Sequence, residues 1–259
     1  TYIAPFVNAE VPEYLVVEDA FPAGRPPLEA AGVYLTDRDT VNRVERMKVT
    51  TCLNPLHTAL AVLGCVLGFT SIAAEMRDPE LVALVRRIGL VEGLPVVTDP
   101  GIIDPKAFLN EVLAERLPNP FIPDTPQRIA TDTSQKISIR FGETIKAYMA
   151  SDTLKTANLV GIPLALAGWL RYLLGVTDTL DPFERSGDPL LADLTRRLAA
   201  VRVGEPETVH DAVAPILSDS ALFGVNLAEA GLASTVEQML REMVAGPGAV
   251  RATLQKYLR

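Results

Sequence analysis

The sequence predicts a mainly all-α protein with a short β segment at its start, and three observations support this fold class. Apolar residues recur at helical spacing along most of the chain after residue 40. β-type runs occur before that point, at residues 14–19 and 32–36. The 259 residues are 48% hydrophobic and 22% charged, which suffices for a substantial core. We therefore expect a β segment over residues 1–40 and roughly eight to ten helices over residues 41–259.

The first elements follow from local signals. The stretch FPAGRPPLEAA between the two β-type runs contains too many Pro and Gly residues for regular structure. Asp and Thr caps predict a helix that begins near residue 40, and an almost uninterrupted apolar run follows it. A further helix is expected to begin at Asp78–Pro79 and to end near Gly89 or Gly93.

The later part of the chain shows the same helical signals. Asp104–Pro105 begins an amphipathic stretch that Pro118 and Pro120 break. A Ser/Thr-rich cap opens the next helical stretch. Apolar residues at helical spacing continue in five stretches, at residues 131–153, 159–176, 188–202, 207–219 and 234–246.

Composition and charge argue against two classes of partner. The formal net charge is −8 and no run of Lys or Arg occurs, so nucleic acid is a poor partner. Residues 58–74 are 17 uncharged positions, at the short end for a membrane-spanning helix. That run and residues 156–170 contain Gly, Ser or Thr, so we interpret both as buried core helices and expect no membrane partner.

The cysteines and the absence of certain motifs argue against a disulfide framework, a nucleotide-binding loop and a zinc site. Cys52 and Cys65 both lie in apolar helical surroundings, which predicts reduced, buried thiols in a cytoplasmic protein. No Gly-rich nucleotide-binding motif follows a strand. No group of His, Cys and carboxylate residues has zinc-ligand spacing, so we expect no metal. The residues that follow Thr1 do not have the pattern of a secretory signal, so we expect none among them.

Polar residues gather at the start of the long apolar run, in the order Glu45, Lys48, Asn54 and His57. Burial makes a lysine easier to deprotonate, so a buried lysine can act as a general acid–base group. An asparagine amide and a histidine can donate hydrogen bonds to an oxygen that becomes negative. A glutamate three residues before the lysine can pass a proton or hold the ammonium. The spacing alone fits equally well a solvated Glu–Lys pair followed by an Asn-Pro turn.

Three motifs, in order, resemble the polyol-specific long-chain dehydrogenases, the mannitol dehydrogenase family that includes fructuronate reductases. VVEDAFPAGRPPLEAAGV is similar to the family's W-V-I-E-D-x-F-x-x-G-R-P stretch. ERMKVTTCLNPLHTALAVLG resembles E-x-M-K…L-N-x-x-H-x-x-L-A-x-x-G, and RLPNPFIPDTPQRIATDTSQK resembles N-P-x-I-x-D…R-I-x-x-D-x-x-x-K. The resemblance covers residues 14–140 well, and beyond them it is limited to helical texture. It implies the multi-helical C-terminal domain of the mannitol dehydrogenase/6-phosphogluconate dehydrogenase-like type.

The resemblance also implies roles for individual residues. Lys48 would be the acid–base lysine, with Glu45 as the glutamate just before it, and Asn54 and His57 would polarise the substrate oxygen. Arg128 and Lys136, eight apart as in the family motif, would bind substrate hydroxyls or a carboxylate. A surface salt-bridge pair is the alternative for these two. His210 is interpreted as an ordinary helix-surface residue.

The family's complete proteins carry an N-terminal Rossmann domain that binds NAD or NADP. By this resemblance residues 1–40 are the last piece of such a domain, and the chain is the substrate-binding and proton-transfer half of a sugar-alcohol or aldonate dehydrogenase, inactive alone. Fructuronate/mannonate is favoured as the substrate pair over mannitol/fructose. The competing hypothesis is a non-catalytic helical module that binds a sugar acid or a partner chain.

One departure from the family motif concerns spacing. The family's asparagine and histidine follow the lysine by five and eight residues, whereas here they follow by six and nine. At about 100° per residue, the longer spacing moves the histidine from roughly 80° to about 180° from the lysine around a straight helix. The sequence therefore predicts a π-type bulge between Lys48 and Asn54, near Pro55, that restores the alignment.

Overall fold

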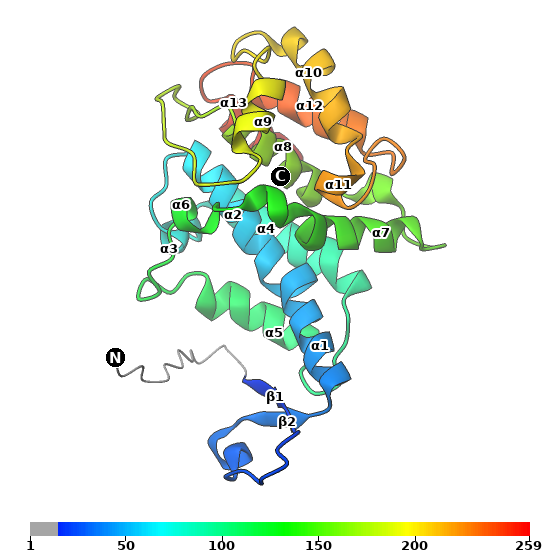
Figure 1. Ribbon diagram of the computed structural model, residues 1–259. Coiled ribbons are helices and arrows are strands. Elements are labelled where there is room, and N and C mark those ends of the chain that lie inside the picture. The colour runs from blue at the N-terminus through cyan, green and yellow to red at the C-terminus, as the bar shows by residue number, and fades with distance from the viewer. Residues whose placement is uncertain (1–14) are drawn as a thin grey trace.

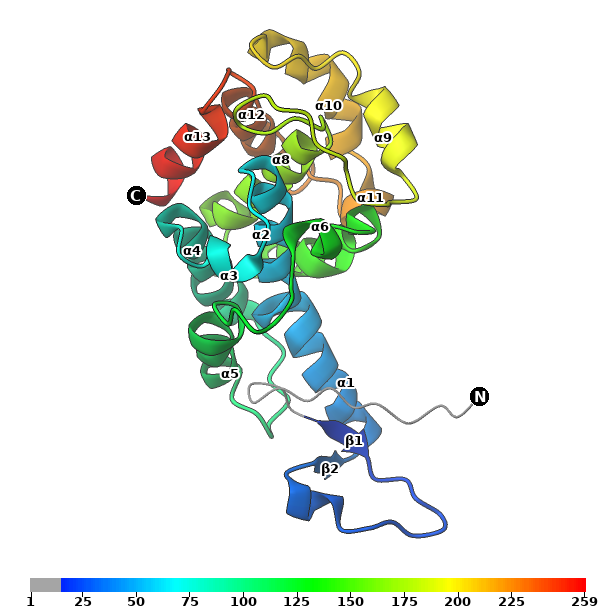
Figure 2. The ribbon, with the colours of Figure 1, turned by 90° about the vertical axis from the view of Figure 1, so that its left-hand side faces the viewer.

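The structure is a computed structural model that describes residues 15–259, so the start of the expected β segment lies outside the described residues. β1 (Val16–Glu18) and β2 (Tyr34–Thr36) pair in parallel, which confirms the two predicted β runs. A 3-10 turn, η1 (Leu28–Ala31), lies in the connection between them. Figures 1 and 2 place this segment at one end of the molecule, below the helices.

A long helical rod leads from the β segment into the core. It consists of α1 (Arg38–Met47), the π-helix η2 (Lys48–Cys52) and α2 (Asn54–Val66). The Asp37 carboxylate caps α1 by accepting a hydrogen bond from the Thr40 N–H at 2.8 Å. This rod meets the length and hydropathy criteria for a membrane span, but 89% of its apolar window is buried inside the protein. That burial agrees with the interpretation of the apolar run as a core helix.

α2 and α8 (Gly161–Tyr172) form the centre of the helical body. Every residue of α8 is buried, as is every residue of α2 except Asn54. Gly168 allows the two helices to approach closely, because a Cβ there would lie 2.7 Å from the Leu63 side chain. α12 (Ala233–Met243) packs on α8. The two longest apolar runs of the sequence are therefore its two central helices.

The other helices surround this pair. They are α3 (Ile72–Glu75), α4 (Pro79–Arg86), α5 (Pro105–Glu111), α6 (Pro126–Ile129), α7 (Glu143–Met149), α9 (Leu191–Arg197), α10 (Val209–Leu217), α11 (Ser220–Phe223) and α13 (Ala249–Leu258). π-helical segments adjoin α4, α5 and α7, at η3 (Arg87–Gly93), η5 (Val112–Arg116) and η7 (Ser138–Gly142). Single 3-10 turns occur at η4 (Leu94–Val96), η6 (Thr133–Gln135), η8 (Thr156–Asn158) and η9 (Pro206–Thr208).

The described residues form thirteen α-helices, more than the eight to ten expected. The expected number was too low because α3, α6 and α11 have four residues each, too few to show an apolar period. The mainly all-α fold class itself is confirmed. Cys52 and Cys65 are buried and unbonded, and burial raises the pKa of each thiol to about 12. Both thiols are therefore uncharged and inert.

Candidate active site

The long rod changes its register between Lys48 and Asn54. The Leu53 N–H donates to the Lys48 carbonyl, five residues earlier, at 3.1 Å, and Lys48–Cys52 is a π-helix. The predicted π-type bulge is thereby confirmed. Because such a bulge absorbs one extra residue, we expect His57 to lie about as far around the rod from Lys48 as eight α-helical residues would place it, roughly 80°.

Pro55 and Thr144 explain how the protein tolerates this bulge. In the i→i−5 register the Thr50 carbonyl faces residue 55, and proline has no N–H to donate. The Thr144 hydroxyl of α7 donates to that carbonyl instead, at 3.4 Å. Leu53 then takes a non-helical backbone conformation (φ −135°, ψ −60°), and α2 begins at Asn54. The local sequence therefore ends one helix and starts the next in the register that the site requires.

His57 is the most enclosed of the expected site residues, with 7% of its surface exposed. Burial is the main cause that lowers the pKa of its imidazole; together with the charges of Arg116, Arg140 and Arg128, and against the opposing charge of Asp124, it brings the pKa to about 4. The ring is thus neutral at neutral pH. Its Nε2 lies 3.6 Å from an Asp124 carboxylate oxygen and has no hydrogen-bond partner among the described residues. A neutral imidazole with an unpaired nitrogen can form a hydrogen bond with a substrate hydroxyl.

Asp124 joins the histidine to two arginines. This carboxylate is 6% exposed and forms salt bridges with Arg116, at 3.3 Å, and with Arg128. The Thr125 hydroxyl caps the short helix α6 by accepting from the Arg128 N–H, which fixes the backbone of that arginine. Because the Arg128 side chain is 62% exposed, its head group can reach a ligand while one edge holds Asp124.

Lys136 and Arg140 complete the positive side of the cluster. Arg140 is largely buried; its guanidinium donates to the Thr58 hydroxyl at 2.6 Å, and burial lowers its pKa to about 10. Burial and the nearby Arg140 charge also lower the pKa of Lys136, whose Nζ donates to the Thr131 carbonyl at 2.5 Å. The structure thus gathers His57, Arg128 and Lys136 around the start of α2, whereas their roles stay predictions.

Lys48, Asn54 and Glu45 are more open than the histidine. Lys48 and Asn54 are half-buried and Glu45 is exposed. In the described part of the chain no salt bridge joins Glu45 to Lys48. The two roles expected for Glu45, holding the ammonium and passing a proton, both stay predictions. His210 is exposed on α10, with Nδ1 2.9 Å from Glu237, which confirms that it is a helix-surface residue.

Three residues of the cluster had no predicted role: Arg116, Asp124 and Arg140. Asp124 is the aspartate of the N-P-x-I-x-D motif, so the motif pointed to this residue but did not indicate its contact with His57. Arg140 follows Lys136 by four residues, a spacing that places two cations on one helix face. The contact of these residues with His57 depends on the packing of distant segments against α2.

The candidate site lies apart from the larger cavities described for the chain. Cavities of about 440 and 450 Å³ are lined by neither Lys48, Asn54 nor His57.

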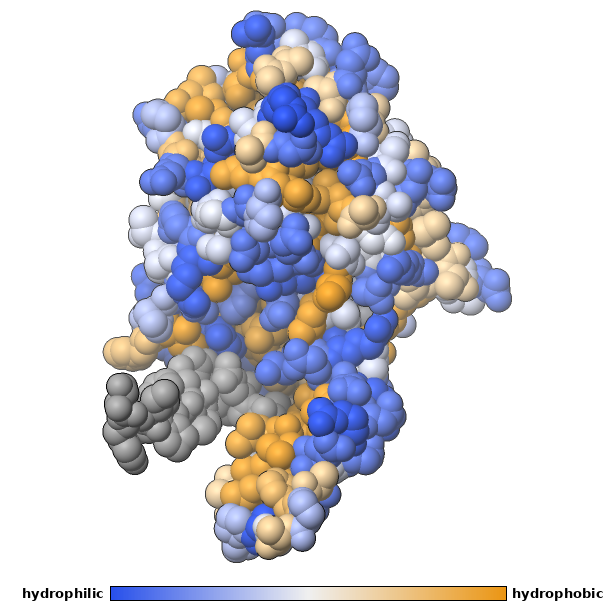
Figure 3. Space-filling model, in the orientation of Figure 1, coloured by the Kyte–Doolittle hydropathy of each residue, from blue (hydrophilic) through white to orange (hydrophobic). Residues whose placement is uncertain are grey.

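At the lower end of α1, Leu15, Phe21 and Tyr34 leave 47%, 38% and 37% of their surfaces exposed. Figure 3 shows apolar residues gathered on this β segment. Exposed apolar surface of this kind is typical of a face that another structural unit covers.

A lysine, an asparagine and a neutral histidine beside several cations are groups that can bind a polar molecule and move a proton. Comparison with known proteins identifies the family: residues 40–244 match the mannitol dehydrogenase C-terminal domain. The chain therefore belongs to the mannitol dehydrogenase family of oxidoreductases, as its motifs predicted.

Named relatives support this assignment. Over its whole length the chain is 57% identical to the D-mannonate oxidoreductase of Thermotoga maritima, and the match covers 48% of that protein. Over 94% of its length it is 30% identical to a mannitol 2-dehydrogenase of Aspergillus fumigatus, and the match covers 45% of that protein. The Pseudomonas fluorescens mannitol 2-dehydrogenase, solved with NAD and D-mannitol, superposes on 93% of the chain with a TM-score of 0.76 and 26% identity, over 45% of its own length. The chain spans about half the length of these relatives.

Proposed function

We propose that this chain is the substrate-binding and proton-transfer half of an NAD(P)-dependent polyol or aldonate dehydrogenase. The single observation that carries the proposal is the π-helix at Lys48–Cys52, which brings Lys48 back to the side of the rod that carries His57. If the motif served only for packing, there would be no reason for a π-helix to compensate the extra residue between Lys48 and Asn54.

Each residue then has a distinct task. Lys48 takes the hydroxyl proton of the carbinol during oxidation and returns it during reduction. Asn54 and the neutral His57 donate hydrogen bonds to the oxygen that carries negative charge in the transition state. Glu45, exposed one helical turn before Lys48, passes the proton on to solvent. Arg128 and Lys136 hold the remainder of the substrate.

The cofactor would be bound mainly by another domain. The parallel pair β1–β2 is too small to be stable alone, and Tyr34 of β2 is exposed together with Leu15 and Phe21, which flank β1. These features fit strands that continue a larger parallel sheet of the Rossmann type, with the domain boundary near residue 40. NAD or NADP bound there would supply the acceptor for the hydride of the carbinol carbon. The chain alone is expected to bind the cofactor weakly or not at all and to turn over no substrate.

The charges around His57 favour a carboxylate-bearing substrate. Around His57 the three arginines Arg116, Arg128 and Arg140 face one carboxylate, that of Asp124, so positive charge is in excess there. Lys136 lies near Arg140, with the carboxylates of Asp132 and Asp188 close by. A sugar acid such as D-mannonate would offset this excess, whereas a neutral polyol would not. We therefore rank mannonate/fructuronate before mannitol/fructose. The buried, unbonded thiols of Cys52 and Cys65 agree with a cytoplasmic location.

The test compares Arg128→Met with a matched surface control, Arg202→Met, in the intact protein. Arg202 is 68% exposed and pairs with Glu205, away from the site. Loss of one charge-assisted contact is expected to raise KM for D-mannonate by about ten- to a hundredfold, with little change for D-mannitol. Equal effects on both substrates would contradict the carboxylate assignment, and no NAD(P)-dependent turnover of either by the intact protein would contradict the proposed function.

A further inference from the structure

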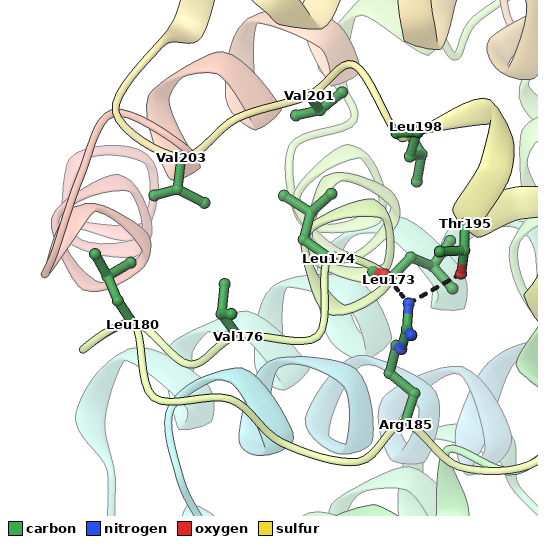
Figure 4. Close-up of a pocket in the computed structure, with 10 residues that line it drawn as sticks. Leu173, Leu174, Val176, Leu180, Arg185, Thr195, Leu198, Val201 and Val203 are labelled. Atoms are coloured by element: carbon green, nitrogen blue, oxygen red, sulfur yellow. Dashed lines mark hydrogen bonds between the residues drawn. The ribbon is translucent and has the colours of Figure 1, made fainter.

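A cavity lies beyond the C-terminal end of α2, apart from the candidate active site at the start of that helix. It has a volume of about 440 Å³ and lies between the loop that follows α8 and the segment that follows α9 (Figure 4). Eight of its ten lining residues are Leu, Val or Ala, and the other two are Arg185 and Thr195. Its volume falls in the range of small-molecule sites.

The cavity is separate from the site around His57. The Asp178 N–H, in the loop beside the cavity, donates to the carbonyl of Val66 at the end of α2. His57 lies in the first turn of the same helix, nine residues earlier. At 1.5 Å per residue the two points are about 13 Å apart along the helix axis.

Arg185 supplies a cation that the protein itself does not neutralise. Its Nη1 donates to the Leu173 carbonyl at 2.7 Å and to the Thr195 hydroxyl at 2.9 Å, as the dashed lines of Figure 4 show. Within residues 15–259 it forms no salt bridge, and neither Nε nor Nη2 donates a hydrogen bond to another group of these residues. The guanidinium is thus held in place by neutral groups while part of its fork stays open to a ligand.

The aliphatic side chains of the lining disfavour a polyol as the occupant. A sugar alcohol in this cavity would place several hydroxyls against aliphatic side chains, and each buried hydroxyl without a partner is unfavourable. An anion with an apolar body matches both features, because its charge can meet Arg185 while its carbon chain fills the aliphatic space.

Leu180 adds a sign of strain at the wall of the cavity. Its φ is +71°, the left-handed region that a bulky residue rarely adopts, and 41% of its surface is exposed. The surrounding turn holds this conformation, since the Leu180 N–H donates to the Thr177 carbonyl at 3.1 Å. Strained residues of this kind concentrate at ligand-binding positions.

The loop that carries Arg185 also contacts the segment that carries Arg128 and Lys136. The Ser186 hydroxyl donates to the Gln127 carbonyl at 2.5 Å, and the Asp132 N–H donates to the Gly187 carbonyl at 2.8 Å. The Asp188 carboxylate accepts from both the N–H and the hydroxyl of Ser134. A ligand that holds Arg185 therefore restrains residues 186–188, and through them residues 127–136.

We propose that this cavity is an effector site for a small anion with an apolar body, of the medium-chain carboxylate class. The carboxylate would bind the open edge of Arg185, and the carbon chain would lie among the aliphatic side chains. Binding would order the loop of residues 183–188 and the neighbouring residues 127–136. The site goes beyond the proposed dehydrogenase function, since its occupancy does not depend on catalysis.

Calorimetric titration of the intact protein with octanoate tests the binding. One site is expected, weakened about tenfold or more by Arg185→Met and unchanged by Arg196→Met, a control on α9 whose side chain is 78% exposed. Val201→Trp, which fills the cavity without touching Arg185, is expected to abolish binding. Acetate, which lacks the apolar body, and 1-octanol, which lacks the charge, should both bind much more weakly.

Hydrogen exchange provides a readout that is independent of enzyme activity. Octanoate is expected to slow amide exchange in residues 183–188 and 127–136 of the intact protein, and not in the Val201→Trp variant. Absence of octanoate binding, equal binding by 1-octanol, or equal affinity in the Arg185 and Arg196 variants would overturn the site. Binding with no change of exchange in residues 127–136 would overturn its role as an effector site.

Discussion

Replacement of Lys48 by alanine probes the chemistry that the π-helix makes possible. In a straight α-helix the nine residues from Lys48 to His57 would turn through about 900°, which places the two side chains about 180° apart. The π-helix absorbs one residue and reduces the offset to about 80°, so both can face one substrate. Loss of a general acid–base group at that position is expected to lower kcat about 10²- to 10⁴-fold.

The same substitution is expected to leave the fold intact. Lys48 is half-buried and forms no salt bridge within the described residues, so the free energy of unfolding should change by less than about 1 kcal/mol. Lys146→Ala on α7, where the lysine is 49% exposed and pairs with Glu143, serves as the matched control. Steady-state kinetics and thermal unfolding of the intact protein are measured for both variants. An unchanged kcat in Lys48→Ala, or a large loss of stability that accounts for the lost activity, would refute the reasoning.

Three further predictions concern stability. The pKa of His57 is about 4 in the folded protein, below its unfolded value of about 6.5. His57 therefore favours folding above about pH 6.5, and this contribution is lost as the pH falls toward 4. The His57→Gln variant should accordingly lose less Tm than the unchanged protein between pH 7 and pH 4. Burial, and after it the charge of Asp78, raises the pKa of Glu75, whose oxygens have no hydrogen-bond partner among the described residues. The contribution of Glu75 to stability therefore falls as the pH rises above about 4.5. Glu75→Gln should raise Tm at pH 8 but not at pH 4. Gly168→Ala forces a Cβ to within 2.7 Å of Leu63 and should cost about 1–3 kcal/mol in denaturant titrations; an unchanged midpoint would contradict the close packing of α2 and α8.

The π-helix was predictable because the motif supplies a reference spacing against which one extra residue stands out. The other π-helical segments, such as η3 and η7, had no such reference, and sequence periodicity alone does not distinguish them from ordinary helix ends. The two central helices were predictable for a different reason. Each is an apolar run of core-helix length, and burial on all sides requires no alternation of polar residues.

The environment of His57 was less accessible from the sequence. Asp124 and Arg116 reach the histidine only because α6 and the segment before it pack against α2, and no local pattern encodes that packing. Glu75 is a similar case, since its carboxyl lies against Gly64 of α2 in the core, a contact between segments that no local pattern indicates. Contacts between segments distant in sequence set the charge and the burial of a site, whereas motifs indicate only which residues take part.

A crystal structure of the intact protein with NAD and D-mannonate tests the central claim most directly. We predict that the Lys48 Nζ lies within about 2.6–3.2 Å of the carbinol oxygen, on the side of the rod that also carries Asn54 and His57. A Lys48 side chain that points to solvent, with another group in contact with that oxygen, would contradict the account.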